Sequence, residues 1–237
     1  MESEKVKVLF MRHGNSMRNN FKSITPYVKH KWDLEFIDCP LHLQGEEESK
    51  SASKIINAQS KLKYVIVSPL IRARQTAMLV TSTYPEMLET YIHPLLRELE
   101  SSSSCIPSEF KMLPSEKASL EYFPESNDKY YYIRGLKYES EMLKKYTGHP
   151  MKEFEKGLAL KMSELYPVYF ETREEFAKRV DNFMEFLKDF IKIHKVANGE
   201  ILVVTHKQFI STAMGYDLKY EDIKNCSITE FDILKNK

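Results

Sequence analysis

His13 stands between Arg12 and Gly14 directly after an apolar run, and this arrangement can carry out phosphoryl chemistry. A neutral imidazole is a good nucleophile toward phosphorus, and histidine is an established covalent catalyst. The planar donor fork of Arg12 matches the oxygens of a phosphate, and Gly14 lets the backbone approach a ligand closely. The same three residues also occur in ordinary surface turns, so the interpretation depends on the residues that accompany them.

Further polar residues follow His13 in an order that supports such a site. Ser16 and Asn19 supply short hydrogen-bonding groups to the same loop. Glu98 supplies a carboxylate, and His206 supplies a second imidazole. The six motifs that contain candidate residues lie at 12–14, 16–19, 38–45, 68–77, 96–98 and 203–206. Residues so far apart in the chain form one site only if regular elements bring them together.

Three short apolar runs predict buried strands, at 6–11, 64–67 and 201–204. Each run ends where candidate residues begin. In open α/β sheets, ligands bind outside the carboxyl ends of the strands. We therefore expect the segments that follow the three strands to meet at one edge of a sheet.

Helical patterns separate these strands. They cover residues 46–59, 70–81 and 172–195, and the last begins with a capping-box pattern of Thr172 and Glu175. The alternation predicts an α/β fold, with a mostly parallel central sheet covered by helices on both faces. We expect a single domain over residues 1–237, with a helical and loop insertion at about 99–170 acting as a lid over the strand ends.

Composition narrows the partners and the location. Apolar residues make up 42% of the 237 residues and charged residues 29%, which indicates a globular protein. The net charge is only +1, which predicts no binding to nucleic acid or an anionic membrane surface. Cys39, Cys105 and Cys226 are far apart, which favours thiols in a reducing compartment. With no signal peptide pattern and no long apolar stretch, we expect a cytoplasmic protein.

Taken together, the six motifs resemble the histidine phosphatase superfamily, the group related to cofactor-dependent phosphoglycerate mutases. The resemblance touches segments from about residue 6 to residue 211, and the insertion looks most like that of a eukaryotic branch of mutase-like proteins. It implies that His13 becomes phosphorylated and that Glu98 first protonates the leaving oxygen, then activates water. No metal or other cofactor is implied. The residues that would surround the phosphoryl group are His206, Arg12, Ser16, Asn19 and Arg72.

Some assignments have alternatives within the sequence. Glu100 lies two residues after Glu98, and Arg74 lies two residues after Arg72. The spacing of the family motifs favours Glu98 and Arg72. Asn15 stands where the family usually has Glu or Gln, and Lys207 where a small residue is usual, so Lys207 could add a cation to the site or crowd it.

Three functions fit the pattern. The first is a phosphatase that acts on a small phosphorylated substrate or a phosphoprotein. The second is a phosphoglycerate mutase, which holds a second phosphate with an arginine pair in the lid; between Glu98 and Thr172 this chain has the single arginine Arg134. The third is a catalytically weak protein-interaction module, which Lys207 favours. The retained set of histidines, arginines and carboxylate favours the phosphatase.

Overall fold

The computed structural model describes residues 6–22, 38–59, 61–86, 88–99, 103–105, 172–196, 199–215 and 223–233. Helices and strands alternate over most of these ranges. In chain order the elements are β1 (Lys7–Arg12), α1 (Met17–Lys22), α2 (Leu43–Gln59), β2 (Leu62–Val67), α3 (Ile71–Thr81), β3 (Glu89–Ile92), the 3-10 turns η3 (Pro94–Leu96) and η4 (Ser103–Cys105), α7 (Arg173–Ile193), β4 (Glu200–Thr205), α8 (Lys207–Ala213) and β5 (Ile228–Asp232).

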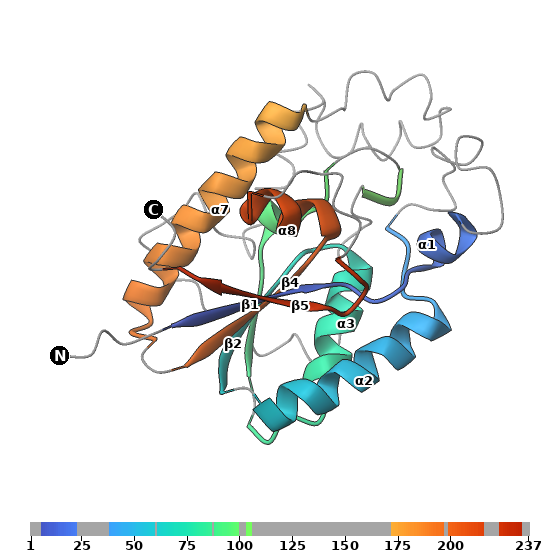
Figure 1. Cartoon of the computed structure of the whole chain (residues 1–237), viewed down its shortest axis with the longest axis horizontal. Coiled ribbons are helices and arrows are strands. Elements are labelled where there is room, and N and C mark those ends of the chain that lie inside the picture. Colours follow the sequence, from blue (N-terminus) through green and yellow to red (C-terminus); the bar gives the residue numbers. More distant parts are fainter. Residues whose placement is uncertain are drawn as a thin grey trace, which may run out of the picture.

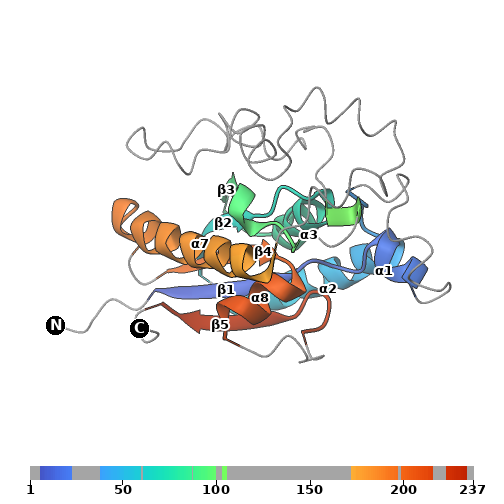
Figure 2. The same ribbon diagram turned by 90° about the horizontal axis from the view of Figure 1, so that it is seen from above.

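The strands form one sheet in the order β3-β2-β4-β1-β5, which can be followed in Figures 1 and 2. The first four strands of this order run parallel, and β5 pairs antiparallel with β1. The expected mostly parallel sheet is therefore confirmed. The three strands predicted from the apolar runs are β1, β2 and β4, each within two residues of its predicted bounds.

Successive residues of the central strands enter two separate cores. Phe10 and Val203 belong to the core under α7 and α8, whereas Met11 and Val204 belong to the core over α2 and α3. Figure 1 shows the two helix pairs on opposite sides of the sheet. Because neighbouring side chains of a strand point to opposite faces, a strand between two helical layers has to be apolar throughout. The predicted cover on both faces is thus confirmed.

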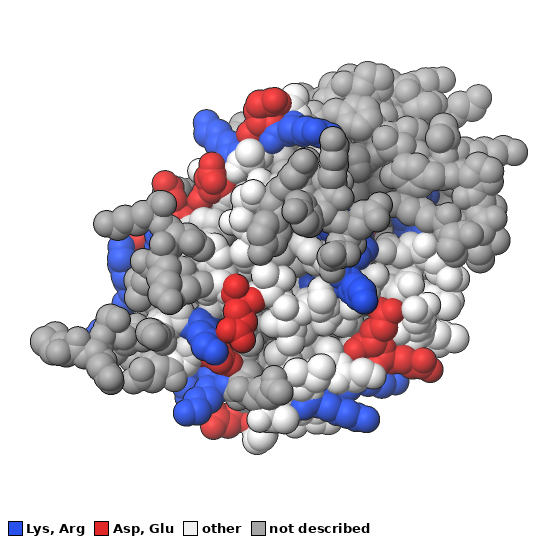
Figure 3. All heavy atoms as spheres, in the orientation of Figure 1, with Lys and Arg blue, Asp and Glu red and all other residues white. Residues whose placement is uncertain are grey.

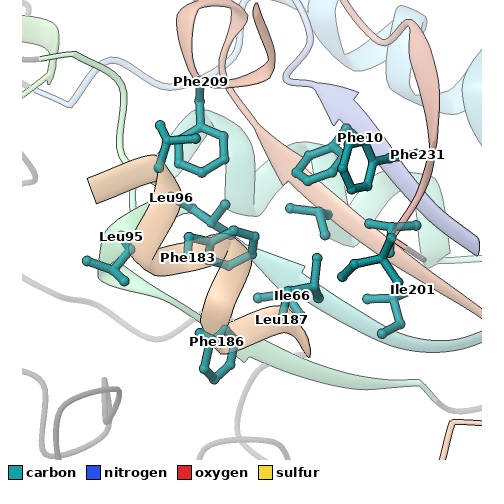
Figure 4. Close-up of a cluster of buried hydrophobic side chains, with 14 of the residues drawn as sticks. Phe10, Ile66, Leu95, Leu96, Phe183, Phe186, Leu187, Ile201, Phe209 and Phe231 are labelled. Atoms are coloured by element: carbon teal, nitrogen blue, oxygen red, sulfur yellow. The ribbon is translucent and has the colours of Figure 1, made fainter. Parts of the chain in front are cut away.

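Helix α7 is the longest described helix, and its pattern was read correctly from the sequence. The Thr172 side chain accepts a hydrogen bond from the Glu175 backbone N–H, and the Glu175 carboxylate accepts one from the Thr172 N–H, so the predicted capping box is present. Figure 4 shows that Phe183 and Leu187 of this helix point into the core beside the sheet. The buried apolar residues of α7 are Phe176, Val180, Phe183, Phe186, Leu187 and Phe190.

The predicted lid at 99–170 lies almost entirely outside the described residues, and its role stays a prediction. The described parts are Leu99 and η4. In the face drawn in Figure 3, the described acidic and basic side chains are interspersed. Within the described ranges, no helix combines the length and apolar character needed to cross a membrane.

A buried histidine next to β3 makes the stability of the fold depend on pH. The ring of His93 is fully buried, its centroid lies 4.2 Å from that of Phe186, and its Nδ1 accepts a hydrogen bond from the Leu95 N–H. Burial lowers the pKa of His93 from 6.5 to about 3. The unfolded chain therefore binds the proton first, so the stabilisation is complete above about pH 6.5 and is lost as pH falls toward 3.

We expect the free energy of unfolding of the wild type to fall by about 2 kcal/mol between pH 7 and pH 5 because of His93. The slope is about 1.4 kcal/mol per pH unit below 6.5. His93→Asn keeps an acceptor near the position of Nδ1 and removes the titration, so its stability should vary less with pH by that amount. Urea unfolding of both proteins at pH 7 and pH 5 measures the difference. Equal pH dependence in the two proteins would contradict the prediction.

Candidate active site

Three of the predicted site residues, His13, Arg72 and His206, meet at the carboxyl ends of β1, β2 and β4, as the strand pattern predicts. The backbone N–H of His13 donates to the Thr205 carbonyl over 2.9 Å, and that of Ser68 donates to Val204 over 3.0 Å. The parallel ladder therefore continues one residue past each strand. The loops that follow β1 and β2 therefore lie on either side of Thr205, the residue before His206.

The His13 ring is held with one nitrogen protonated and the other bearing a lone pair. Its Nδ1 lies 2.7 Å from the Gly14 carbonyl oxygen, which can only accept, so Nδ1 carries the proton. Its Nε2 lies 3.3 Å from Nε of Arg72, which can only donate. Nε2 is thus the unprotonated nitrogen, and its electron pair, which a nucleophile requires, accepts the hydrogen bond from Arg72.

Arg72 connects the two histidines. Its Nε donates to His13, its Nη2 lies 3.4 Å from His206 Nδ1, and its Nη1 donates to the Ser104 carbonyl over 2.7 Å. The side chain is 4% exposed, so this planar cation is fixed between both rings in a largely dry environment. Ser104 belongs to η4, so the described start of the insertion already reaches the site.

His206 is neutral, and its proton position is set by its neighbours. Because Arg72 donates to Nδ1, the ring proton lies on Nε2, which is 2.7 Å from the Ser68 hydroxyl. Burial, followed by the charges of Arg72, Arg179 and Arg12, lowers the pKa of His206 well below 6.5. The centroids of the two imidazole rings lie 5.0 Å apart. Two neutral imidazoles therefore flank one guanidinium.

Glu98 lies close enough to the two arginines for their charges to act on it. Burial raises the pKa of Glu98 above its ordinary value of 4.5, against the opposing effects of the Leu99 N–H, Arg72 and Arg12. The Gln208 backbone N–H, in the first turn of α8, also lowers the pKa of this carboxyl group. The site thus contains one carboxyl group that retains its proton to a higher pH than an exposed glutamate.

Arg12 lies at the site and is hydrogen-bonded to the backbone of the segment that follows α8. Its Nη1 donates to the Ile223 carbonyl over 2.7 Å. Burial lowers its pKa, the Glu98 charge raises it, and the Arg72 charge lowers it. Two guanidinium groups and one carboxyl group therefore interact, which is a suitable environment for an anionic ligand.

Ser16 and Asn19 have a structural role that the sequence analysis missed. The Ser16 hydroxyl accepts a hydrogen bond from the Asn19 backbone N–H over 3.3 Å and donates to the Asn19 carboxamide oxygen over 2.7 Å. This is the geometry of an N-cap for α1. Their contact with a phosphoryl group stays a prediction. Lys207 is the first residue of α8 and is half-buried, and its effect on the site likewise stays a prediction.

Close backbone packing fixes the His13 loop. A Cβ at Gly14 would lie 2.6 Å from the Gly45 carbonyl oxygen, so only glycine fits where the loop meets α2. The Gly14 N–H donates to the Thr76 hydroxyl over 3.0 Å. The Asp38 carboxylate accepts from the Ile71 N–H over 2.8 Å and so caps α3 from a distant segment. The predicted segments 38–45 and 68–77 therefore support the loop.

Two supporting residues were missed in the sequence. Asn225 donates from its Nδ2 to the His13 carbonyl over 2.7 Å. Arg179 of α7 donates to carbonyls on both sides of Glu98. A signal for Arg179 was present, because it interrupts the apolar stripe between Phe176 and Phe183. No comparable pattern marks Asn225. Within the described ranges, no group of three His, Cys, Asp or Glu side chains is placed to hold a metal ion.

Comparison of sequences gives one family. Residues 8–103 match the model of the histidine phosphatase superfamily (branch 1). This range contains His13, Arg72 and Glu98 and ends before η4 is complete. A comparison with curated proteins gives no match.

Solved structures share the fold. A phosphoglycerate mutase from Bacillus anthracis is 18% identical with a TM-score of 0.56, covering 97% of this chain and 89% of its own. The alpha-ribazole phosphatase from Shigella flexneri is 17% identical with a TM-score of 0.51, covering 95% of this chain and 90% of its own. Phosphoserine phosphatase from Entamoeba histolytica, in complex with 3-phosphoglyceric acid, gives the same four values. At these identities the likeness establishes the fold.

Proposed function

We propose that this member of the histidine phosphatase superfamily, identified through residues 8–103, hydrolyses a phosphomonoester by way of a phosphohistidine on His13. One observation carries the proposal. The Nε2 lone pair of His13 faces a buried guanidinium, Arg72, which also contacts the neutral ring of His206. A nucleophile beside a fixed cation is suited to an anionic electrophile, because the cation stabilises charge that develops on the electrophile's oxygens.

The first half of the reaction transfers the phosphoryl group to the protein. His13 Nε2 forms a bond to phosphorus while the bond from phosphorus to the ester oxygen breaks. The protonated Glu98 carboxyl group gives its proton to that oxygen, so the leaving group departs as a neutral alcohol. Arg72, Arg12 and His206 stabilise the phosphoryl oxygens throughout.

The second half returns the protein to its starting state. The Glu98 carboxylate takes a proton from water, and the water oxygen bonds to phosphorus as the phosphorus–nitrogen bond breaks. His13 recovers its Nε2 lone pair. Its Nδ1 keeps its proton throughout, because that proton is hydrogen-bonded to the Gly14 carbonyl oxygen. Inorganic phosphate then leaves.

The direction of the pKa shift supports Glu98 as the acid. A carboxyl group whose pKa is raised by burial remains protonated nearer to neutral pH, where a general acid is most effective. The turnover of an alkyl phosphomonoester should therefore fall as pH rises through the pKa of Glu98. Two carboxylates compete for this role in the sequence, and Glu100 lies outside the described residues.

Glu98→Gln is expected to lower kcat for an alkyl phosphomonoester by about 10²-fold or more and to remove the fall in rate on the alkaline side. Glutamine keeps the size and hydrogen-bonding capacity of the side chain but cannot supply a proton. Initial rates between pH 5 and pH 9 measure both effects, and Glu100→Gln is the matched control. If Glu100→Gln changes the profile and Glu98→Gln does not, the acid has been misassigned.

The activity itself is tested with two assays on the wild type. Release of 4-nitrophenol from its phosphate reports hydrolysis, and isomerisation of 3-phosphoglycerate reports mutase activity. We propose a small phosphorylated molecule as substrate, in keeping with the ligand of the Entamoeba histolytica phosphatase. Hydrolysis without isomerisation is the expected result. Isomerisation faster than hydrolysis would favour the mutase, and the absence of both would favour the interaction module.

A further inference from the structure

Glu98 lies in a segment whose described residues directly after η3, residues 97–99, belong to no helix or strand. Its apolar side chains enter the core, where Figure 4 shows Leu95 and Leu96 beside Phe183. Its backbone carbonyls require hydrogen-bond donors, because burying a carbonyl group without a hydrogen bond is unfavourable in free energy. The Leu96 carbonyl is bound by the Thr205 hydroxyl over 2.8 Å.

Arg179 supplies the donors for the rest of this segment. Its Nη1 donates to the carbonyls of Leu95 and Arg97 over 2.6 and 2.8 Å, and its Nη2 donates to that of Glu98 over 3.3 Å. The side chain is 2% exposed, and its guanidinium lies 4.8 Å from the ring centroid of Phe176. One planar cation is thus fixed to three carbonyls more than 80 residues away.

These bonds hold the two peptide planes that meet at Glu98. The Arg97 carbonyl belongs to the peptide before the Glu98 Cα, and the Glu98 carbonyl belongs to the peptide after it. Because each peptide is planar, fixing both restricts the two backbone dihedrals of Glu98. The direction in which its side chain leaves the backbone is then set as well.

We propose that Arg179 is a positioning residue that aims the Glu98 carboxyl group at the leaving oxygen. The inference rests on the proposed role of Glu98 as general acid. A planar fork is required, because a lysine ammonium is a point charge that cannot hold peptide groups on both sides of Glu98 in one plane. Arg179 acts through the backbone and does not touch the substrate.

The test compares two leaving groups. 4-Nitrophenolate leaves readily without a proton, whereas a simple alkoxide needs one. A misaimed acid should therefore slow an alkyl phosphomonoester far more than 4-nitrophenyl phosphate. General loss of structure should slow both equally, so the ratio of the two kcat values separates positioning from stability.

We expect Arg179→Met to lower kcat for glycerol phosphate by about 10²-fold, the cost of a small misplacement, and kcat for 4-nitrophenyl phosphate by less than about 3-fold. Arg179→Lys should show the same selectivity with a smaller loss. Lys178→Met, at an exposed neighbouring position on α7, is the matched control and should change neither rate. If Arg179→Met does not fold, as judged by circular dichroism, Arg179→Lys decides.

Equal losses on both substrates in the folded variant, or no loss on either, would overturn the inference. Glu98→Gln measured alongside separates it from the proposed function. If Glu98→Gln shows the selective loss and the Arg179 variants do not, only the positioning role fails. If Glu98→Gln itself lacks the selectivity, Glu98 is not the acid, and the inference fails with it.

Discussion

His13→Ala is expected to lower kcat for phosphomonoester hydrolysis by at least about 10⁴-fold, because it removes the atom that we propose bonds to phosphorus. In the described part of the chain, the imidazole beside His13 is that of His206, whose Nε2 carries the ring proton and lies 2.7 Å from the Ser68 hydroxyl, so His206 is not oriented to take its place. The loop should persist, since Gly14, Thr76 and Asn225 hold its backbone. Initial rates with 4-nitrophenyl phosphate measure the effect, and urea unfolding checks the fold.

His42→Ala is the matched control for the loss of an imidazole near the same loop. The ring of His42 contacts Asn20 and the Gln44 N–H, and only its backbone N–H reaches the His13 loop, at the Asn15 carbonyl. Its kcat should stay within about 3-fold of the wild type, as for a surface substitution away from the chemistry. Retention of a few per cent of activity by a folded His13→Ala protein would refute the nucleophile assignment.

Arg72→Ala is expected to lower kcat by about 10³-fold, at the upper end of the loss for one donor to developing charge. Arg72 also orients both imidazoles, so its removal disturbs the nucleophile as well as the phosphoryl oxygens. Arg72→Lys should recover part of the loss, because it restores the charge without the planar fork. Steady-state kinetics should show the loss mainly in kcat rather than in KM.

Arg74→Lys distinguishes the two arginines that the sequence left as alternatives. Arg74 lines a groove with Met78, Tyr84 and Leu88 on the other side of α3, whereas Arg72 lies between the histidines. The Arg74 variant should keep kcat within about 3-fold of the wild type. A greater loss from Arg74→Lys than from Arg72→Lys would show that the motif spacing had been aligned wrongly.

Much of the fold could be predicted because the central strands lie between two helical layers. Such strands are apolar on both faces, so 64–67 and 201–204 are continuous apolar runs that stand out from the polar chain around them. Their carboxyl ends then define where site residues meet. The convergence of His13, Arg72 and His206 follows from this rule together with the motif order.

The two edge strands, β3 and β5, could not be predicted, because their sequences are not continuously apolar. β3 has four residues and begins with Glu89, and β5 contains Glu230 and Asp232, so neither forms an apolar run. An edge strand pairs on one side only and tolerates charge. Its position is determined by a neighbouring strand, which a local pattern cannot reveal.

The residues that support the backbone of the site, Arg179 and Asn225, could not be predicted from the sequence either. Arg179 bonds to carbonyls more than 80 residues away, and Asn225 bonds to one 212 residues away. Backbone carbonyls have no residue identity, so no motif identifies their partners. The side chains proposed to perform chemistry could be found by residue type, whereas those that hold the backbone around them could be found only in three dimensions.

The most direct test of the account is the intact mass of the protein after brief mixing with a reactive phosphoryl donor, kept from acid throughout. The wild type should gain the mass of one phosphoryl group and lose it on brief acidification, as a phosphorus–nitrogen bond requires. His13→Ala should gain nothing. An acid-stable adduct, an equal adduct on His13→Ala, or hydrolysis of the donor by folded His13→Ala would contradict a phosphohistidine on His13.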